Sequence, residues 1–121
     1  RRRNAKRYNE LLNDVDDIIT PYEAEYAKHV YHLYVIKTKN KNKRDELQKF
    51  LKDSKIECGV HYPIPLHLQP AYNYLSLKEG AFPVTEEAAK TMLSLPMFPE
   101  MTEEQIRYVV DKIKELFNNL K

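Results

Sequence analysis

The chain has 121 residues, of which 42% are hydrophobic and 31% are charged. This length provides one modest hydrophobic core, and the composition excludes a disordered chain. With 20 basic and 18 acidic side chains, the net charge of +2 gives little attraction for nucleic acid. No apolar run approaches the roughly 18 residues that a membrane-spanning helix needs. We therefore expect a single domain over residues 1–121, with neither nucleic acid nor a membrane as its partner.

Cysteine usage and the first residues bear on the cellular setting. Cys58 is the single cysteine, so no intramolecular disulfide can form, and a cytoplasmic location is the simplest interpretation. Arg1, Arg2 and Arg3 are followed by polar residues rather than by the apolar core of a signal peptide. The sequence lacks an initiating Met and opens inside a helical pattern, so we expect a piece of a longer protein.

The first predicted element is a helix over residues 1–17. Pro21 ends its pattern, and no capping residue precedes Arg1. Five apolar residues recur at helical spacing, namely Ala5, Tyr8, Leu12, Val15 and Ile19. We therefore expect residues 1–20 to be the remainder of a helix that joined this domain to another.

Two strands and a helix are predicted next. Residues 29–36 are β-branched, aromatic and apolar, which predicts a strand with apolar side chains on both faces. Residues 44–53 have an amphipathic helical pattern, with Asn42 as the expected N-cap. Residues 56–62 are predicted to be a second strand, in which Gly59 allows another chain or a ligand to approach closely.

The following segment is rich in proline. Residues 63–70 are predicted to be a rigid surface loop that ends in a helical turn over residues 71–75. Thr85 is the expected cap of a helix that runs to about Thr91, and residues 93–95 are a candidate third strand.

A capping box formed by Thr102 and Gln105 predicts the C-terminal helix. One apolar stripe follows it, made of Ile106, Val109, Val110, Ile113, Leu116, Phe117 and Leu120. This order of elements predicts an α+β fold, in which helices cover one face of a small, mainly antiparallel sheet. The other face of the sheet then needs a partner.

Residue spacing argues against a metal site and against a stand-alone catalytic site. His29 and His32 lie three positions apart on a predicted strand and so point to opposite faces, as do Cys58 and His61. The chain has neither a glycine-rich phosphate loop nor a Ser-centred nucleophile motif. Most lysines stand in polar runs, which do not favour Schiff-base chemistry.

Residues 59–67 are chemically unusual, because they place two imidazoles and a phenol in a backbone stiffened by proline. His61, Tyr62 and His67 are able to donate hydrogen bonds to a phosphate or sugar oxygen. The alternative is that these side chains only cap loop carbonyls. The residues alone leave both interpretations open.

Several motifs, taken together, resemble the DegT/DnrJ/EryC1/StrS aminotransferase family. They occur in the family's order over nearly the whole chain, at residues 29–36, 59–67, 69–72, 82–86, 93–97 and 101–106. The resemblance implies the C-terminal small domain of an enzyme with the aspartate-aminotransferase (type I) fold. Such enzymes are homodimers that use pyridoxal phosphate to move an amino group, usually from L-glutamate, onto a nucleotide-linked keto sugar.

The resemblance also implies roles for individual residues. His61 and Tyr62 match the pair that approaches the diphosphate of the nucleotide sugar. His32 and Tyr34 are implied as supporting residues that face the active site, and His67 and Tyr72 are weaker candidates for substrate contact.

The family's Schiff-base lysine and most of its cofactor contacts belong to the large domain, which this chain lacks. We therefore expect no catalytic, cofactor-binding or metal-binding residue here, and an inactive chain when it is alone. The alternative is a free-standing module of this fold that binds a nucleotide sugar or a protein.

One departure from the family pattern concerns stability. Lys55 stands where relatives have Gly before the Ile that opens the predicted second strand. We expect Lys55 to adopt a left-handed conformation at the end of the preceding helix, at a cost of about 1 kcal/mol. Phe82, where many relatives have Cys, is a second difference without an evident consequence.

Overall fold

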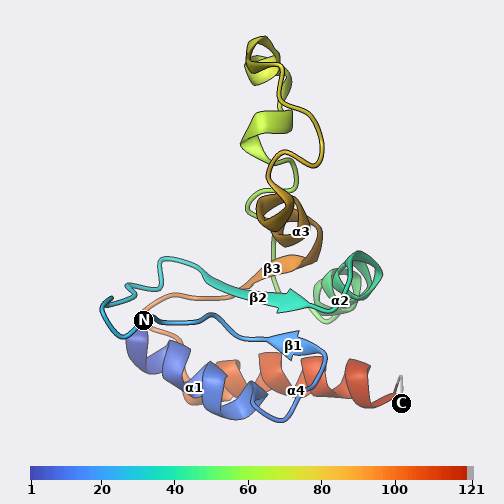
Figure 1. Cartoon of the computed structure of the whole chain (residues 1–121). Helices are drawn as coiled ribbons and strands as arrows, with labels where there is room; N and C mark the ends of the chain where they lie inside the picture. Colours follow the sequence, from blue (N-terminus) through green and yellow to red (C-terminus); the bar gives the residue numbers. More distant parts are fainter. Residues whose placement is uncertain (120–121) are drawn as a thin grey trace.

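The computed structural model describes residues 1–119. Figure 1 shows a layer of strands with α1 and α4 below it, α3 above it, and an arm of irregular chain that projects beyond α3. The elements in chain order are α1 Arg2–Leu12, β1 Ile18–Ile19, β2 Tyr34–Thr38, α2 Lys41–Asp53, the 3-10 helices η1 Leu66–Leu68 and η2 Pro70–Leu75, α3 Pro83–Thr91, β3 Met92–Leu95 and α4 Glu103–Asn119.

The three strands form one antiparallel sheet in the order β1-β2-β3. In the register of β2 with β3, Tyr34 pairs with Leu95 and Ile36 with Leu93, and all four side chains are buried. The intervening positions point to the opposite face, where Lys37 is exposed. The α+β fold with a small antiparallel sheet is thus confirmed.

The core lies between the sheet and the pair α1 and α4. Tyr8 of α1 is fully buried and stacks on Tyr34 of β2, with ring centroids 4.7 Å apart. The Tyr8 hydroxyl donates to the carbonyl of Pro96 at 3.1 Å. The predicted stripe of α4 is buried here, through Ile106, Val109, Val110, Ile113, Leu116 and Phe117, whereas Leu120 lies outside the described residues. Most of the hydrophobic stabilisation of the fold therefore comes from this layer.

The first helix is shorter than predicted. It ends at Leu12, and the amide of Val15 then donates to the carbonyl of Leu12 at 3.1 Å, a turn that takes the chain out of the helix. Residues Ile18 and Ile19, expected near the helix end, form β1 and pair with β2. Val15 and Ile18 are still buried, because a turn and a short strand present them to the same core.

The strand predicted over residues 29–36 begins only at Tyr34. Tyr31 has a positive φ of 48°, which a strand does not tolerate. Its amide donates to Nδ1 of His29 at 2.8 Å, so a local turn replaces the sheet hydrogen bond. Residues 29–33 are therefore a connection to the sheet rather than a strand.

The strand predicted over residues 56–62 is also wrong, since the segment makes only an isolated bridge between Gly59 and Ser94. The backbone groups on either side of Ser94 along this edge of β3 are not free to form further strand hydrogen bonds. The carbonyl of Met92 accepts from the Arg44 guanidinium at 3.2 Å, and Pro96 has no amide hydrogen to donate. Ser94 is thus the one residue of β3 left to pair with the segment.

Helix α2 starts three residues earlier than predicted, with Asn40 as its N-cap in place of Asn42. At its other end, the amide of Ile56 donates to the Leu51 carbonyl and the amide of Lys55 to the Lys52 carbonyl, which is a Schellman motif. Lys55 has a φ of 62°, so its predicted left-handed conformation is confirmed.

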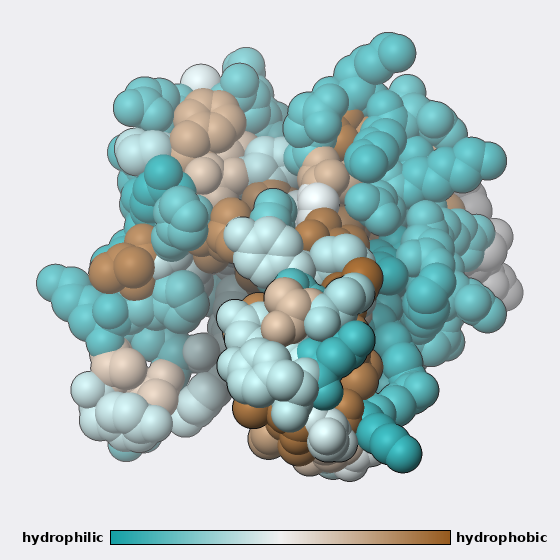
Figure 2. All heavy atoms as spheres, turned by 90° about the horizontal axis from the view of Figure 1, so that it is seen from above, coloured by the Kyte–Doolittle hydropathy of each residue, from teal (hydrophilic) through white to brown (hydrophobic). Residues whose placement is uncertain are grey.

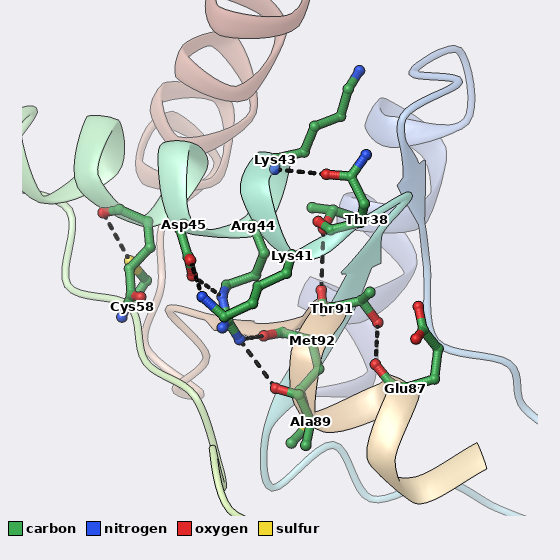
Figure 3. Close-up of polar contacts among 12 residues, drawn as sticks. Thr38, Lys41, Lys43, Arg44, Asp45, Cys58, Glu87, Ala89, Thr91 and Met92 are labelled. Atoms are coloured by element: carbon green, nitrogen blue, oxygen red, sulfur yellow. Dashed lines mark hydrogen bonds and ion pairs between the residues drawn. The ribbon is translucent and has the colours of Figure 1, made fainter. Parts of the chain in front are cut away.

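Arg44 joins α2 to the junction of α3 and β3. Its side chain is buried and donates to the carbonyls of Ala89 and Met92, each at 3.2 Å (Figure 3). Beside it, the Thr38 hydroxyl donates to the Thr91 carbonyl at 3.3 Å. These contacts fix the direction in which α3 and the arm leave the sheet.

The start of α3 differs from the prediction, whereas the start of α4 agrees with it. Pro83 is the first residue of α3, which places Thr85 inside the helix rather than at its cap. Before α4, the amide of Gln105 donates to the Thr102 hydroxyl and the Gln105 side chain accepts from the Thr102 amide. The predicted capping box is therefore confirmed.

Candidate functional site

The arm, defined as residues 62–82, is the most exposed part of the structure. Every residue from Pro70 to Thr85 is exposed, although the arm carries few charges. Figure 2, which looks down onto the arm, shows apolar side chains among the polar ones. The large exposed apolar residues in and beside the arm are Tyr62, Ile64, Leu66, Tyr72, Tyr74, Leu75, Leu77, Phe82 and Val84. A surface of this kind is typical of a contact with another part of a larger protein.

Glu86 of α3 closes the base of the arm. Its carboxylate contacts Nε2 of His67 at 2.8 Å and accepts hydrogen bonds from the backbone amides of Gly80 and Phe82. The Gly80 amide, with further help from Phe82 and His67, lowers the pKa of Glu86 below its ordinary value. His67 lies near the start of the arm and Gly80 near its end, so one carboxylate holds the two ends of the arm together.

His61 lies where the arm leaves the sheet. Its Nδ1 is 2.9 Å from the hydroxyl of Ser94, and its ring forms a T-shaped contact with Tyr62 at 5.6 Å between centroids. The Tyr62 side chain is 70% exposed. The peptide bond between His61 and Tyr62 is cis. An imidazole and a phenol are thus presented next to each other at the surface.

A pocket of about 330 Å³ opens beside this pair. Arm residues form one wall and α3 forms the other, with Met92 of β3 at the junction. The main side chains that line it are His61, Tyr62, Leu66, Val84, Ala88 and Met92. A largely apolar pocket whose polar side chains are His61, Tyr62, Gln69 and Thr85 suits an organic ligand that carries a polar or charged group.

The structure does not bring the other predicted site residues to this surface. Tyr34 is fully buried on the opposite face of the sheet, and its hydroxyl donates to Asn9 at 2.6 Å. Burial raises the pKa of Tyr34, so the phenol stays protonated and bound to Asn9. His32 is exposed in the connection that precedes β2, and its carbonyl accepts from Arg1 at 3.0 Å. Tyr34 is therefore a core residue in this chain rather than one that faces the same surface as His61.

His67 and Tyr72 also differ from His61 and Tyr62 in their surroundings. The His67 side chain is buried and contacts Glu86, so it supports the arm instead of presenting a free donor. Tyr72 lies in η2, partly exposed, and packs near Tyr74. Of the predicted candidates, His61 and Tyr62 are the ones that stand together beside a pocket.

Sequence reasoning missed Ser94 and Glu86. Ser94 appeared only as a strand residue, and Glu86 only as part of a family motif. A polar side chain at an alternating position of an apolar strand is the signal that identifies Ser94 as different. For Glu86, the signal is an acidic residue in the first turn of a helix, where free amides are available.

Neither a metal-binding cluster nor an activated thiol is found among the described residues. Within residues 1–119, no three His, Cys, Asp or Glu side chains are grouped to hold a metal ion. Burial raises the pKa of the Cys58 thiol, whose Sγ lies 3.8 Å from the Gln48 carbonyl, so a reactive thiolate is not favoured. Over the same stretch, no helix is long and apolar enough to cross a membrane.

Pyridoxal phosphate does not fit the lysines of residues 1–119. Each of them is exposed or half-buried, and several are engaged in ion pairs, such as Lys43 with Asp17 and Lys114 with Asp14. A Schiff-base lysine needs a site that lowers its affinity for a proton, through burial or a neighbouring cation. No step through the cofactor follows from these residues.

Comparison with known proteins gives one consistent result. The model of the DegT/DnrJ/EryC1/StrS aminotransferase family matches residues 1–114. The "Pleiotropic regulatory protein" of Geobacillus stearothermophilus is 50% identical over 98% of this chain. The dTDP-3-amino-3,4,6-trideoxy-alpha-D-glucose transaminase of Streptomyces venezuelae is 35% identical over 92% of this chain.

The fold agrees with these relatives. The crystal structure of S. venezuelae DesV in complex with a ketimine intermediate has a TM-score of 0.88 and 34% identity over 95% of this chain. The chain spans only part of each relative, namely 32% of the G. stearothermophilus protein, 28% of the S. venezuelae transaminase and 30% of the DesV chain. On the family match and these relatives, the chain belongs to the DegT/DnrJ/EryC1/StrS aminotransferase family.

Proposed function

We propose that this chain is the C-terminal small domain of an aminotransferase that acts on nucleotide sugars. The complete enzyme uses pyridoxal phosphate to transfer an amino group from an amino acid, L-glutamate, to a nucleotide-linked keto sugar. The main support is the match of the whole fold to about a third of an enzyme caught with a ketimine intermediate. The S. venezuelae transaminase, which is named for an amino sugar linked to dTDP, gives the substrate class.

In this proposal, His61 and Tyr62 bind the diphosphate of the nucleotide sugar. Both side chains are exposed, both carry hydrogen-bond donors, and they stand together beside a pocket of about 330 Å³. Hydrogen bonds to a charged oxygen are stronger than those between neutral groups, which suits this pair to an anion. The pocket is lined by α3 and Met92, on the sheet face away from α1 and α4, and in this proposal the second domain closes over the substrate from that side.

The large domain of the same polypeptide supplies the Schiff-base lysine and most of the cofactor contacts in this proposal. The exposed apolar residues of the arm support it, because a low-charge surface of this size is unusual on an isolated domain. The chain alone is then inactive, and the complete enzyme works as a cytoplasmic homodimer. Residues 1–20 connect the two domains.

The coding DNA upstream of the Arg1 codon tests the division into domains. We expect a continuous reading frame for a protein about three times this length, since the chain spans 32% of a relative that is 50% identical. A start codon close to Arg1 would contradict the proposal and favour a free-standing module. Covalent trapping of pyridoxal phosphate on one lysine of the isolated chain would also contradict it.

One observation favours a second function, a binding module of this fold. The relative that is 50% identical is named as a regulatory protein rather than as an enzyme. This function predicts saturable binding of a nucleotide sugar by the isolated chain, with nuclear magnetic resonance (NMR) shifts centred on His61 and Tyr62. Shifts spread over the arm, with no saturation, would argue against it.

A further inference from the structure

Ser94 has a buried hydroxyl that neither the fold nor the proposed substrate contact explains. Its side chain points to the sheet face opposite the core, while its neighbours Leu93 and Leu95 point into the core. Ser94 is only 5% exposed. Among the described residues, its hydroxyl has one hydrogen-bond partner, Nδ1 of His61 at 2.9 Å.

The backbone around this contact is fixed on both sides. The Ser94 amide donates to the Gly59 carbonyl at 2.7 Å, and the Gly59 amide donates to the Ser94 carbonyl at 3.2 Å. The His61 ring lies against Gly59, since a Cβ placed there would be 3.1 Å from its Cε1 atom. Such a contact is too close for a larger residue without a shift of the ring. The imidazole is thus held by Ser94 on one edge and rests on the glycine backbone.

Proton counting decides the direction of the hydrogen bond. If Nδ1 carried the proton, the Ser94 hydroxyl would accept, and its own hydrogen would need another acceptor in a nearly buried position. Burying a polar hydrogen without an acceptor is unfavourable. If Ser94 donates to Nδ1, both groups are satisfied, and the neutral imidazole carries its proton on Nε2. Within residues 1–119, Nε2 of His61 has no hydrogen-bond partner.

We propose that Ser94 is a positioning residue, which holds His61 in one ring orientation and in the Nε2–H tautomer so that Nε2–H points to an anionic oxygen of the substrate. The ring orientation and the tautomer are inferred from the structure of this chain alone. The direction toward the substrate rests on the function proposed above.

NMR on the 121-residue chain tests the orientation and the tautomer. At about pH 8, where a histidine is ordinarily neutral, we expect a nuclear Overhauser contact between Hε1 of His61 and the α-hydrogens of Gly59. Long-range ¹H–¹⁵N correlations should show the proton on Nε2. Ser94→Ala should weaken the contact and introduce the second tautomer.

Thr91→Val is the matched control. It removes another nearly buried hydroxyl close to β3, which donates to the Glu87 carbonyl at 2.9 Å and is not hydrogen-bonded to His61. This variant should leave the His61 signals unchanged. If Ser94→Ala also leaves them unchanged, or if the wild-type ring carries its proton on Nδ1, the positioning role is wrong.

Kinetics of the complete enzyme tests the substrate part. Ser94→Ala should raise KM for the nucleotide sugar about fivefold, the equivalent of one lost hydrogen bond, with KM for L-glutamate unchanged. In a His61→Ala background, the same change should have no further effect. If His61→Ala raises KM and Ser94→Ala does not, the positioning role is overturned while the substrate contact stands. If His61→Ala leaves KM unchanged, the substrate contact itself is overturned.

Discussion

Replacement of Lys55 by glycine should stabilise this domain. Lys55 has a φ of 62° in the Schellman motif that ends α2, and a side chain with a Cβ is strained in that conformation by about 1–2 kcal/mol. Glycine removes the strain, but it also raises the conformational entropy of the unfolded chain, which lowers the free energy of unfolding by about 0.4–1 kcal/mol. The Lys55 side chain is exposed, with no hydrogen bond or ion pair to lose among those found in residues 1–119. The net expectation is a gain of about 0.5–1 kcal/mol.

Urea unfolding of the 121-residue chain, followed by circular dichroism at low protein concentration, measures this gain. The midpoint should rise by about 0.5 M with an unchanged slope. Lys49→Gly is the matched control, because Lys49 is exposed in the middle of α2, where glycine should cost about 1 kcal/mol. The same substitution thus has opposite signs six positions apart. If Lys55→Gly is neutral or destabilising while Lys49→Gly behaves as expected, the left-handed conformation is refuted.

Three further predictions concern the site and its support. In the complete enzyme, Tyr62→Phe should raise KM for the nucleotide sugar about fivefold, which corresponds to about 1 kcal/mol, and an unchanged KM and kcat would defeat the assignment. Because backbone amides lower the pKa of Glu86, its support of the arm should be complete above pH 4.5 and be lost only as the pH falls below that ordinary value. The Gly80 amide shift should therefore titrate with a midpoint below 4.5 and not titrate there in Glu86→Gln; a wild-type midpoint at or above 4.5 would be inconsistent with this contact. Arg44→Met should destabilise the domain by about 2 kcal/mol in urea unfolding, because the buried carbonyl of Ala89 and the partly buried carbonyl of Met92 lose their donor, and a loss under about 0.5 kcal/mol would show that water replaces it.

Local sequence patterns predicted the elements whose causes are local. The capping box of Thr102 and Gln105 and the apolar stripe behind it place α4. The left-handed conformation of Lys55 was expected from the resemblance to the family, whose members have Gly there, and it is confirmed. The short strand over residues 93–95 was also predictable, since Pro96 and Pro99 follow it closely and limit its length. Each of these signals lies within a few residues of the structure that it determines.

One error comes from contacts that are distant in sequence, whereas the strand predicted over residues 29–36 is shortened by the local turn at His29 and Tyr31. Residues 56–62 have the composition of a strand, yet Arg44 occupies the carbonyl of Met92 and Pro96 lacks an amide hydrogen, so the edge of β3 accepts a single bridge. Tyr34 matched a family motif, and the β2 register turns its side chain toward the core; its role as a support of the site stays a prediction.

The site was only partly predictable for the same reason. His61 and Tyr62 were recognisable as donors in a stiff segment. The residue that holds the His61 ring, Ser94, lies 33 positions away, and the partner of His67, Glu86, lies 19 positions away. No local spacing rule joins residues at these separations.

The central claim, that this chain completes an enzyme that aminates nucleotide sugars, is tested most directly by following the amino nitrogen. The complete protein would be incubated with ¹⁵N-labelled L-glutamate and a panel of nucleotide-linked keto sugars, and the products analysed by mass spectrometry. We expect ¹⁵N in an amino sugar that is still linked to its nucleotide, with transfer reduced in His61→Ala at low sugar concentration. Absence of ¹⁵N from every sugar of the panel, while the protein binds a nucleotide sugar reversibly, would contradict the enzymatic account and support a binding module instead.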